Sequence, residues 1–207
     1  MASKLGIYNG ALRLLGERKL ASLAENREPR RVLDDLYDTQ CNVCLSQANW
    51  NFATRPVRLD SDTDIEASFG YTYTFGKPED WLRTTAVSSD EYFREPLKEY
   101  DDVGSYWRAD IDPVYVKYVS NDADWGMDLS RWTPLFEVYA MAHFASEMAE
   151  HHGPKSKVDD LRLLARRRLM KASAVEAVGQ PVEFYPTGSW VRARGGNLGG
   201  YRKYNRA

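Results

Sequence analysis

One apolar stripe between residues 28 and 49 constrains the fold more than any other part of this sequence. Its members recur mainly at spacings of three and four residues, and they are Leu33, Leu36, Tyr37, Cys41, Cys44, Leu45 and Ala48. That spacing places them on one face of an α-helix. The opposite flank is charged and carries Arg30, Arg31, Asp34, Asp35 and Asp38. The segment is therefore predicted to be an amphipathic helix that buries one face against neighbouring elements.

Three further segments show a helical period, and they cover residues 3–15, 134–152 and 156–178. Gly16 suits a left-handed C-cap that ends the first of them. Thr133 and Pro134 suit the N-cap and first position of the second. Ser156 and Asp159 form a near capping box at the start of the third. Because the apolar stripes must be buried against one another, the sequence predicts a four-helix bundle.

The middle of the chain shows the period of β-strands. Tyr71, Tyr73 and Phe75 alternate with threonines, and residues 106–109 and 114–119 are predicted to pair as a hairpin. The expected fold class is α+β, with a small antiparallel β-domain inserted into the helical bundle and an extended C-terminal tail. The expected boundaries are 1–54 and 129–178 for the bundle, 55–128 for the β-domain and 179–207 for the tail.

The net charge of −2 conceals an uneven distribution. Residues 60–128 contain seventeen acidic and six basic residues, and no acidic residue follows Glu183. The basic residues of that last segment are Arg192, Arg194, Arg202, Lys203 and Arg206. Such a basic end is either a solvated, disordered tail or an arm that docks onto a partner.

The amino end lacks the apolar segment of a signal peptide, and no run of apolar residues approaches the length of a membrane span. The chain is therefore expected to be soluble and to be made in a cytoplasm.

No pattern indicates a catalytic, cofactor or metal site. Cys41 and Cys44 form a lone Cys-x-x-Cys, and the few histidines do not supply the remaining ligands of a zinc site. Since both cysteines belong to the apolar stripe, they are predicted to be buried core thiols. A calcium loop that begins at Asp60 fails, because Ile65 and Tyr71 stand where glycine and glutamate are needed.

One helix and the tail raise a second function, the binding of nucleic acid. The last helix carries a basic face formed by Arg162, Arg166, Arg167, Arg168 and Lys171, and aromatic residues lie among the arginines of the tail. Basic residues neutralise phosphates and aromatic rings stack on bases. The acidic middle and an isoelectric point of about 6.0 argue against a general nucleic-acid surface. A solvated face or a subunit contact is the main interpretation, and a nucleic-acid-binding module is the alternative.

Several short motifs occur in a characteristic order. They are Leu14-Leu15-Gly16, Trp50-Asn51-Phe52-Ala53, the aromatic strand at 70–73 with Pro78 to Arg83, and the Trp132 to Phe144 helix start. In these motifs the chain resembles the head–tail adaptor proteins of tailed phages, called tail tubular protein A in short-tailed phages. The resemblance covers nearly the whole chain, and the long basic tail departs from the usual pattern.

The resemblance implies a structural virion protein at the head–tail interface and not an enzyme. Copies would form a dodecameric ring that joins the portal protein to the tail nozzle protein, with tail fibres as a possible further partner. DNA would pass through the ring without specific binding. No cofactor and no membrane are implied.

The resemblance also gives roles to particular residues. Trp50 and Phe52 are expected at the junction of bundle and β-domain, and the basic residues of the last helix at a subunit interface. The acids expected to face the channel are Asp60, Asp62, Asp64, Asp101 and Asp102. The residues expected to dock onto the portal are Trp190, Arg192, Arg194, Tyr201, Arg202, Lys203, Tyr204 and Arg206.

Overall fold

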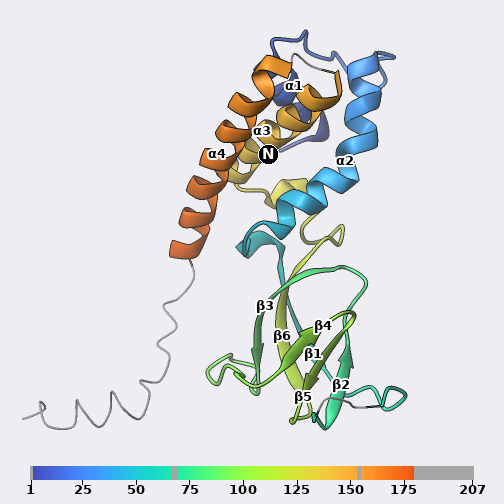
Figure 1. Ribbon diagram of the computed structural model, residues 1–207, viewed down its shortest axis with the longest axis vertical. Coiled ribbons are helices and arrows are strands. Elements are labelled where there is room, and N and C mark those ends of the chain that lie inside the picture. The colour runs from blue at the N-terminus through green and yellow to red at the C-terminus, as the bar shows by residue number, and fades with distance from the viewer. Residues whose placement is uncertain (1, 67–69, 153–154, 180–207) are drawn as a thin grey trace, which may run out of the picture.

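The computed structural model describes residues 2–66, 70–152 and 155–179. These residues form a mixed α+β fold with four α-helices at one end and two small antiparallel sheets at the other (Figure 1). The helices are α1 (Lys4–Leu15), α2 (Glu28–Ser46), α3 (Pro134–His152) and α4 (Val158–Val178). The strands are β1 (Thr54–Leu59), β2 (Tyr73–Gly76), β3 (Trp81–Ser88), β4 (Asp101–Val103), β5 (Tyr106–Ala109) and β6 (Val114–Ser120).

The helix ends follow the predicted capping residues in two of three cases. The Ser3 hydroxyl accepts a hydrogen bond from the Gly6 amide at 3.0 Å, and Gly16 ends α1 in the left-handed region at φ 84°. Thr133 caps α3 by accepting from the Phe136 amide at 3.4 Å. The near capping box at Ser156 is wrong. A short 3₁₀ turn at Lys155–Lys157 precedes α4, and Lys157 occupies the N-cap without a side-chain hydrogen bond.

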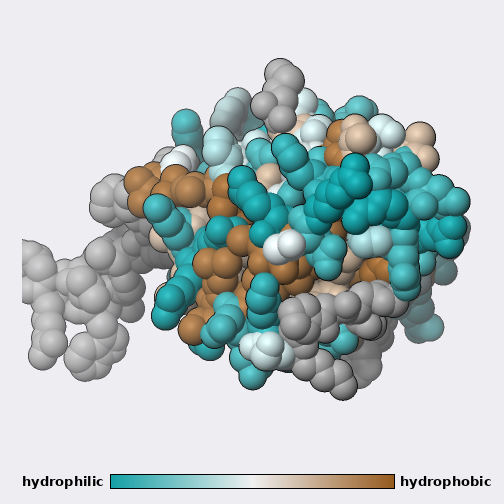
Figure 2. Space-filling model, turned by 90° about the horizontal axis from the view of Figure 1, so that it is seen from above, coloured by the Kyte–Doolittle hydropathy of each residue, from teal (hydrophilic) through white to brown (hydrophobic). Residues whose placement is uncertain are grey.

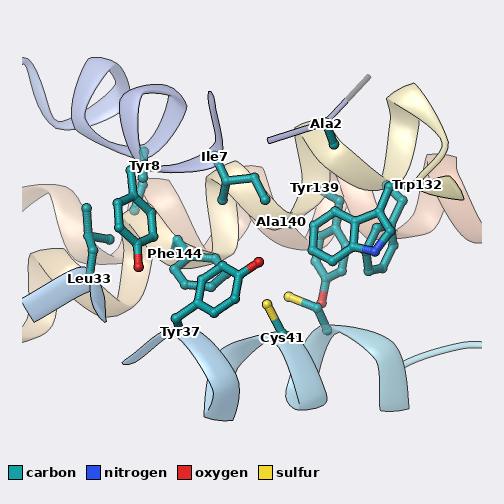
Figure 3. Packing of buried hydrophobic residues seen from close by; sticks show 14 of the residues in the cluster. Ala2, Ile7, Tyr8, Leu33, Tyr37, Cys41, Trp132, Tyr139, Ala140 and Phe144 are labelled. Atoms are coloured by element: carbon teal, nitrogen blue, oxygen red, sulfur yellow. The ribbon is translucent and has the colours of Figure 1, made fainter. Parts of the chain in front are cut away.

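Helix α3 lies at the centre of the helical part and packs against α1, α2 and α4. In Figure 3, Tyr37 and Cys41 of α2 face Ile7 of α1 and Phe144 of α3. Every member of the α2 stripe except Leu36 and Ala48 is buried, which confirms the predicted core face of this helix. Burial of such a stripe is the main source of stability for a helix of this kind.

The strands form two three-stranded sheets, in the orders β1-β6-β3 and β2-β5-β4. One apolar core joins them, with Phe75 and Trp107 from one sheet and Val116 and Tyr118 from the other. The predicted hairpin between residues 106–109 and 114–119 is wrong, because β5 pairs with β2 and β4 while β6 pairs with β1 and β3. Residues between β5 and β6 instead carry the chain from one sheet to the other.

Candidate functional site

Trp50 and Phe52, the residues expected at the junction, belong to an aromatic cluster of the helical core. The ring centroid of Phe136 lies 4.7 Å from that of Trp50 and 4.9 Å from that of Phe52. Trp132 adds an edge-to-face contact with Phe136 at 4.6 Å. Such edge-to-face pairs are favoured because the positive edge of one ring meets the negative face of another. Strand β1 begins directly after this cluster, at Thr54.

Hydrogen bonds connect the same segment to three elements. The Trp50 indole N–H donates to the Cys44 carbonyl of α2 at 3.2 Å, and the Thr54 hydroxyl donates to the Trp50 carbonyl at 2.7 Å. The Asn51 backbone amide donates to the Glu176 carboxylate of α4 at 3.1 Å. The Asn51 side-chain amide donates to the Glu176 carbonyl at 3.0 Å. The Trp-Asn-Phe segment therefore holds the ends of α2 and α4 at the start of β1.

A polar cluster centred on Asp80 lies at the end of the β1-β6-β3 sheet nearest the helices. The Asp80 carboxylate accepts hydrogen bonds from Arg55 at 3.0 Å, from Tyr118 at 3.1 Å and from Ser120. Burial by itself would raise the pKa of Asp80. The bonds from Ser120, Arg55 and Tyr118 outweigh burial and hold that pKa below its ordinary value. The carboxylate thus joins β1, the start of β3 and β6.

Replacing Asp80 with asparagine should lower the free energy of unfolding by about 2 kcal/mol near neutral pH, because charge-assisted hydrogen bonds are lost. A depressed folded-state pKa gives stability above the unfolded pKa of about 3.9, and this stability disappears as the pH falls through the folded value. The difference between wild type and Asp80→Asn should therefore shrink below about pH 4. Urea unfolding at several pH values measures it. Asp64→Asn, at an exposed carboxylate, is the control, and a difference independent of pH would contradict the assignment.

The basic residues of α4 lie on its solvent side. Arg162, Arg166, Arg167 and Lys171 are all exposed, and Arg162 forms an ion pair with Glu150 of α3. The opposite side of α4 packs on α3 through the buried residues Leu161, Ala165 and Ala172. Apolar residues also lie among the basic ones on this side, at Leu163 and Met170, which the predicted basic face does not include. Brown apolar side chains are indeed visible among teal ones when the helical end is viewed from above (Figure 2).

The acids expected to face a channel are not brought together. Asp60, Asp62 and Asp64 lie in the loop that leads toward β2, where the Asp62 amide donates to the Thr74 carbonyl at 2.8 Å. Asp101 and Asp102 lie on β4, which is the edge strand opposite β2 in the β2-β5-β4 sheet.

Asp101 and Asp102 also have cationic partners. Asp101 pairs with Arg108 at 3.0 Å, and Asp102 pairs with Lys77, whose side chain is only 4% exposed and lies over the Trp81 ring at 3.8 Å. These ion pairs join β4 to β5 and to the end of β2, and they offset the negative charge of both carboxylates.

The residues expected to dock onto a portal all lie outside the described residues. They are Trp190, Arg192, Arg194, Tyr201, Arg202, Lys203, Tyr204 and Arg206.

The cysteines are free and buried, as the apolar stripe predicts. Burial raises the pKa of Cys41 to about 12, so its thiol stays protonated and unreactive near neutral pH. His143 is part-buried with its Nε2 at 2.8 Å from Gln40 Oε1, and burial lowers its pKa. Within the part of the chain that the structure describes, no group of three or more histidine, cysteine or acidic residues is placed to hold a metal ion.

A scan against models of protein families finds no match for this chain, and a search of curated proteins finds no significantly similar sequence. Among the described helices, none is both long and apolar enough to cross a membrane.

Proposed function

We propose that this chain is a structural virion protein, a head–tail adaptor whose copies form a dodecameric ring between the portal protein and the tail nozzle protein. One observation carries the proposal. The motif that most specifically resembles the adaptor family, Trp50-Asn51-Phe52-Ala53, is the segment that joins α2, α4 and β1. Proteins that assemble in the same way need the same arrangement of helices and strands, and a motif that fixes this arrangement would be common to them.

The finer fold belongs to the same proposal. The four helices form a bundle around α3, the β-domain is inserted between α2 and α3, and residues 179–207 form an extended arm that docks onto the portal. The contacts that α3 makes with α1, with α2 and with α4 support the bundle. The composition of the arm, basic and rich in glycine and aromatic residues, suits a segment that becomes ordered on binding.

The charges of the described residues fit a ring that lets DNA pass. Asp60, Asp62 and Asp64 lie in one loop, in which Asp60 pairs with Arg58 at 2.9 Å. Negatively charged carboxylates there would repel a DNA phosphate backbone. This loop is proposed to approach the axial channel, together with Asp101 and Asp102 of β4. Tail fibres, if they bind, would meet the outside of the β-domain.

Electron microscopy of the protein mixed with its portal protein tests the proposal. Rings of twelvefold symmetry on the portal are expected for the full chain. Deleting residues 187–207 should abolish attachment while the circular dichroism of the monomer is unchanged. A matched variant, Arg202→Gln with Lys203→Gln and Arg206→Gln, separates the charge of the arm from its length. Unaltered attachment of the deleted chain would refute the docking arm, and an absence of rings for the full chain would refute the adaptor.

The exposed basic face of α4 favours one other function, a nucleic-acid-binding module formed by residues 156–178 and the tail. A gel-shift titration at several salt concentrations separates the two. A module that neutralises phosphates loses affinity steeply as salt rises, whereas the adaptor should bind DNA weakly at every salt concentration. Tight binding that Arg166→Gln with Arg167→Gln weakens would favour the alternative.

A further inference from the structure

The C-terminal end of α4 carries a buried acidic residue at a position where a helix disfavours one. Glu176 lies in the last turn of this helix, which ends at Val178, and its side chain is only 7% exposed. The carbonyl groups at this end are the negative pole of the helix dipole, so an acidic side chain is unfavourable there. Burial adds a further cost unless the carboxylate is hydrogen-bonded. The position of Glu176 therefore needs a compensating contact.

Asn51 makes that contact through two hydrogen bonds. Its backbone N–H donates to the Glu176 carboxylate at 3.1 Å, and its side-chain amide donates to the Glu176 carbonyl at 3.0 Å. This carbonyl is one of the last four in α4, which lack the usual acceptor role within the helix. It also accepts from the Gly179 amide at 3.2 Å. Asn51, which precedes Glu176 by 125 residues, thus serves as a cap for the end of α4.

Few other contacts hold this end of the helix. Within the described part of the chain, the α4 residues that belong to the helical core end at Ala172. Of residues 173–179, only Glu176 is buried, and Val178 is 86% exposed. An open groove of about 490 Å³ lies between these turns and the end of α2, and in Figure 1 the turns form the edge of the helical part. The contact with Asn51 therefore anchors the last turn of α4.

The anchored turn is also the place from which the C-terminal segment leaves the helical part. Helix α4 ends at Val178, and the arm proposed to dock onto the portal begins at Gly179. A Cβ atom added at Gly179 would lie 3.3 Å from the Asn51 side-chain nitrogen, so the first residue of the arm lies against the same side chain. Asn51 itself begins the short turn that leads into β1. The start of the arm is thus fixed relative to the junction of the two cores.

We infer that Glu176 is a positioning residue, whose hydrogen bonds with Asn51 fix the place and direction from which the C-terminal arm leaves the chain. This inference rests on the proposed docking of the arm onto the portal and names the contact that prepares it. Every copy in a symmetric ring has to present its arm in the same place. An arm whose starting point is already held loses less conformational freedom when it docks, which favours binding.

Hydrogen exchange of the free, full-length chain tests the anchor. Glu176→Ala should speed exchange of the amides of residues 175–179 at least about tenfold, because the last turn opens more often once it is released. The amides of residues 161–170 should keep their protection. Glu176→Gln retains an oxygen that accepts from the Asn51 amide, so it should exchange as wild type does. Val178→Ala, which shortens an exposed side chain of the same turn, is the matched control and should also exchange as wild type does.

Binding of the same variants to the portal protein tests the positioning role. Glu176→Ala should weaken attachment at least about tenfold, although residues 179–207 are unchanged, because the arm no longer starts from a fixed point. Glu176→Gln and Val178→Ala should attach as wild type does. Rescue by glutamine would assign the effect to the hydrogen bond with Asn51.

The outcomes separate this inference from the adaptor itself. Equal exchange in Glu176→Ala and wild type would overturn the anchor. Faster exchange with undiminished attachment would overturn the positioning role and leave the adaptor proposal standing. Equal losses in Glu176→Gln and Glu176→Ala would overturn the hydrogen bond as the cause. A wild-type chain that does not attach to the portal would refute the adaptor and the positioning role together, whereas the exchange rates would still decide whether Glu176 anchors α4.

Discussion

Replacing Gly126 with alanine is expected to lower the free energy of unfolding by about 3 kcal/mol or more. Gly126 is buried in the loop between β6 and α3. A Cβ atom at this position would lie 2.1 Å from the Ser120 carbonyl oxygen and 2.9 Å from Leu45 Cδ1. Real Cβ atoms do not approach a backbone oxygen so closely, so the end of β6 or the loop has to move.

Movement of either segment disturbs bonds that join the two halves of the fold. The Gly126 carbonyl accepts a hydrogen bond from the Trp132 indole at 2.8 Å, and Ser120 donates to Asp80. The strain therefore spreads to the aromatic cluster on one side and to the Asp80 cluster on the other. Urea unfolding followed by far-ultraviolet circular dichroism measures the loss.

Gly76→Ala is the matched control for this substitution. No heavy atom lies within 4 Å of the Cβ that alanine would add there, and the residue is exposed at the end of β2. Its free energy of unfolding should change by less than about 0.5 kcal/mol. Equal unfolding midpoints for Gly126→Ala and wild type would show that the loop can relax without cost, contrary to the expectation.

Local signals in the sequence were sufficient for the helices. The Gly16 stop and the stripe from Leu33 to Leu45 depend on neighbours within two turns, and both appear in the structure. The inward face of α4 follows from the same period. The exposed apolar residues Leu163 and Met170 lie among basic residues on the outer side of α4. A helical period alone does not show which of two apolar faces is buried.

Pairings between distant segments could not be predicted. Alternation identifies β5 and β6 as strands, but it says nothing of which strand each one joins. Both strands bury one face in a core shared by two sheets, and that arrangement covers Trp107 and Tyr118 better than a two-stranded hairpin in water. The ion pairs of Asp101 and Asp102, the Asp80 cluster and the close approach at Gly126 depend on the same long-range choices. No short sequence pattern predicts these contacts.

Replacing Trp50 with alanine is expected to lower the free energy of unfolding by about 3 to 5 kcal/mol. Trp50 has no exposed surface, and its ring contacts Phe52, Phe136 and Tyr139. Alanine leaves a cavity at that point. It also removes the donor to the Cys44 carbonyl, which lies in the last turn of α2. Trp50→Phe should cost less, about 1 to 3 kcal/mol, because it keeps an aromatic ring and loses the indole hydrogen bond and part of the volume.

The matched control is Trp125→Ala. Trp125 is a half-buried tryptophan whose ring contacts the Arg131 guanidinium at 4.8 Å, and it belongs to neither core cluster. Its removal should cost about 1 kcal/mol or less, the usual contribution of an exposed cation–π contact. Urea unfolding of the three variants and wild type gives the order Trp50→Ala, Trp50→Phe, Trp125→Ala from the least to the most stable.

The position of Trp50 also bears on whether the helical part and the β-domain unfold together. The helical part and the β-domain have separate cores, and the segment that begins at Trp50 connects them. If that segment couples the two cores, Trp50→Ala should unfold its helices at a lower urea concentration than its β-domain. The signal of Trp81 and Trp107 in the near ultraviolet would then persist after the far-ultraviolet helix signal is lost. Coincident transitions in Trp50→Ala, at a lower midpoint than wild type, would mean that the Asp80 cluster and the Gly126 loop alone keep the two cores coupled.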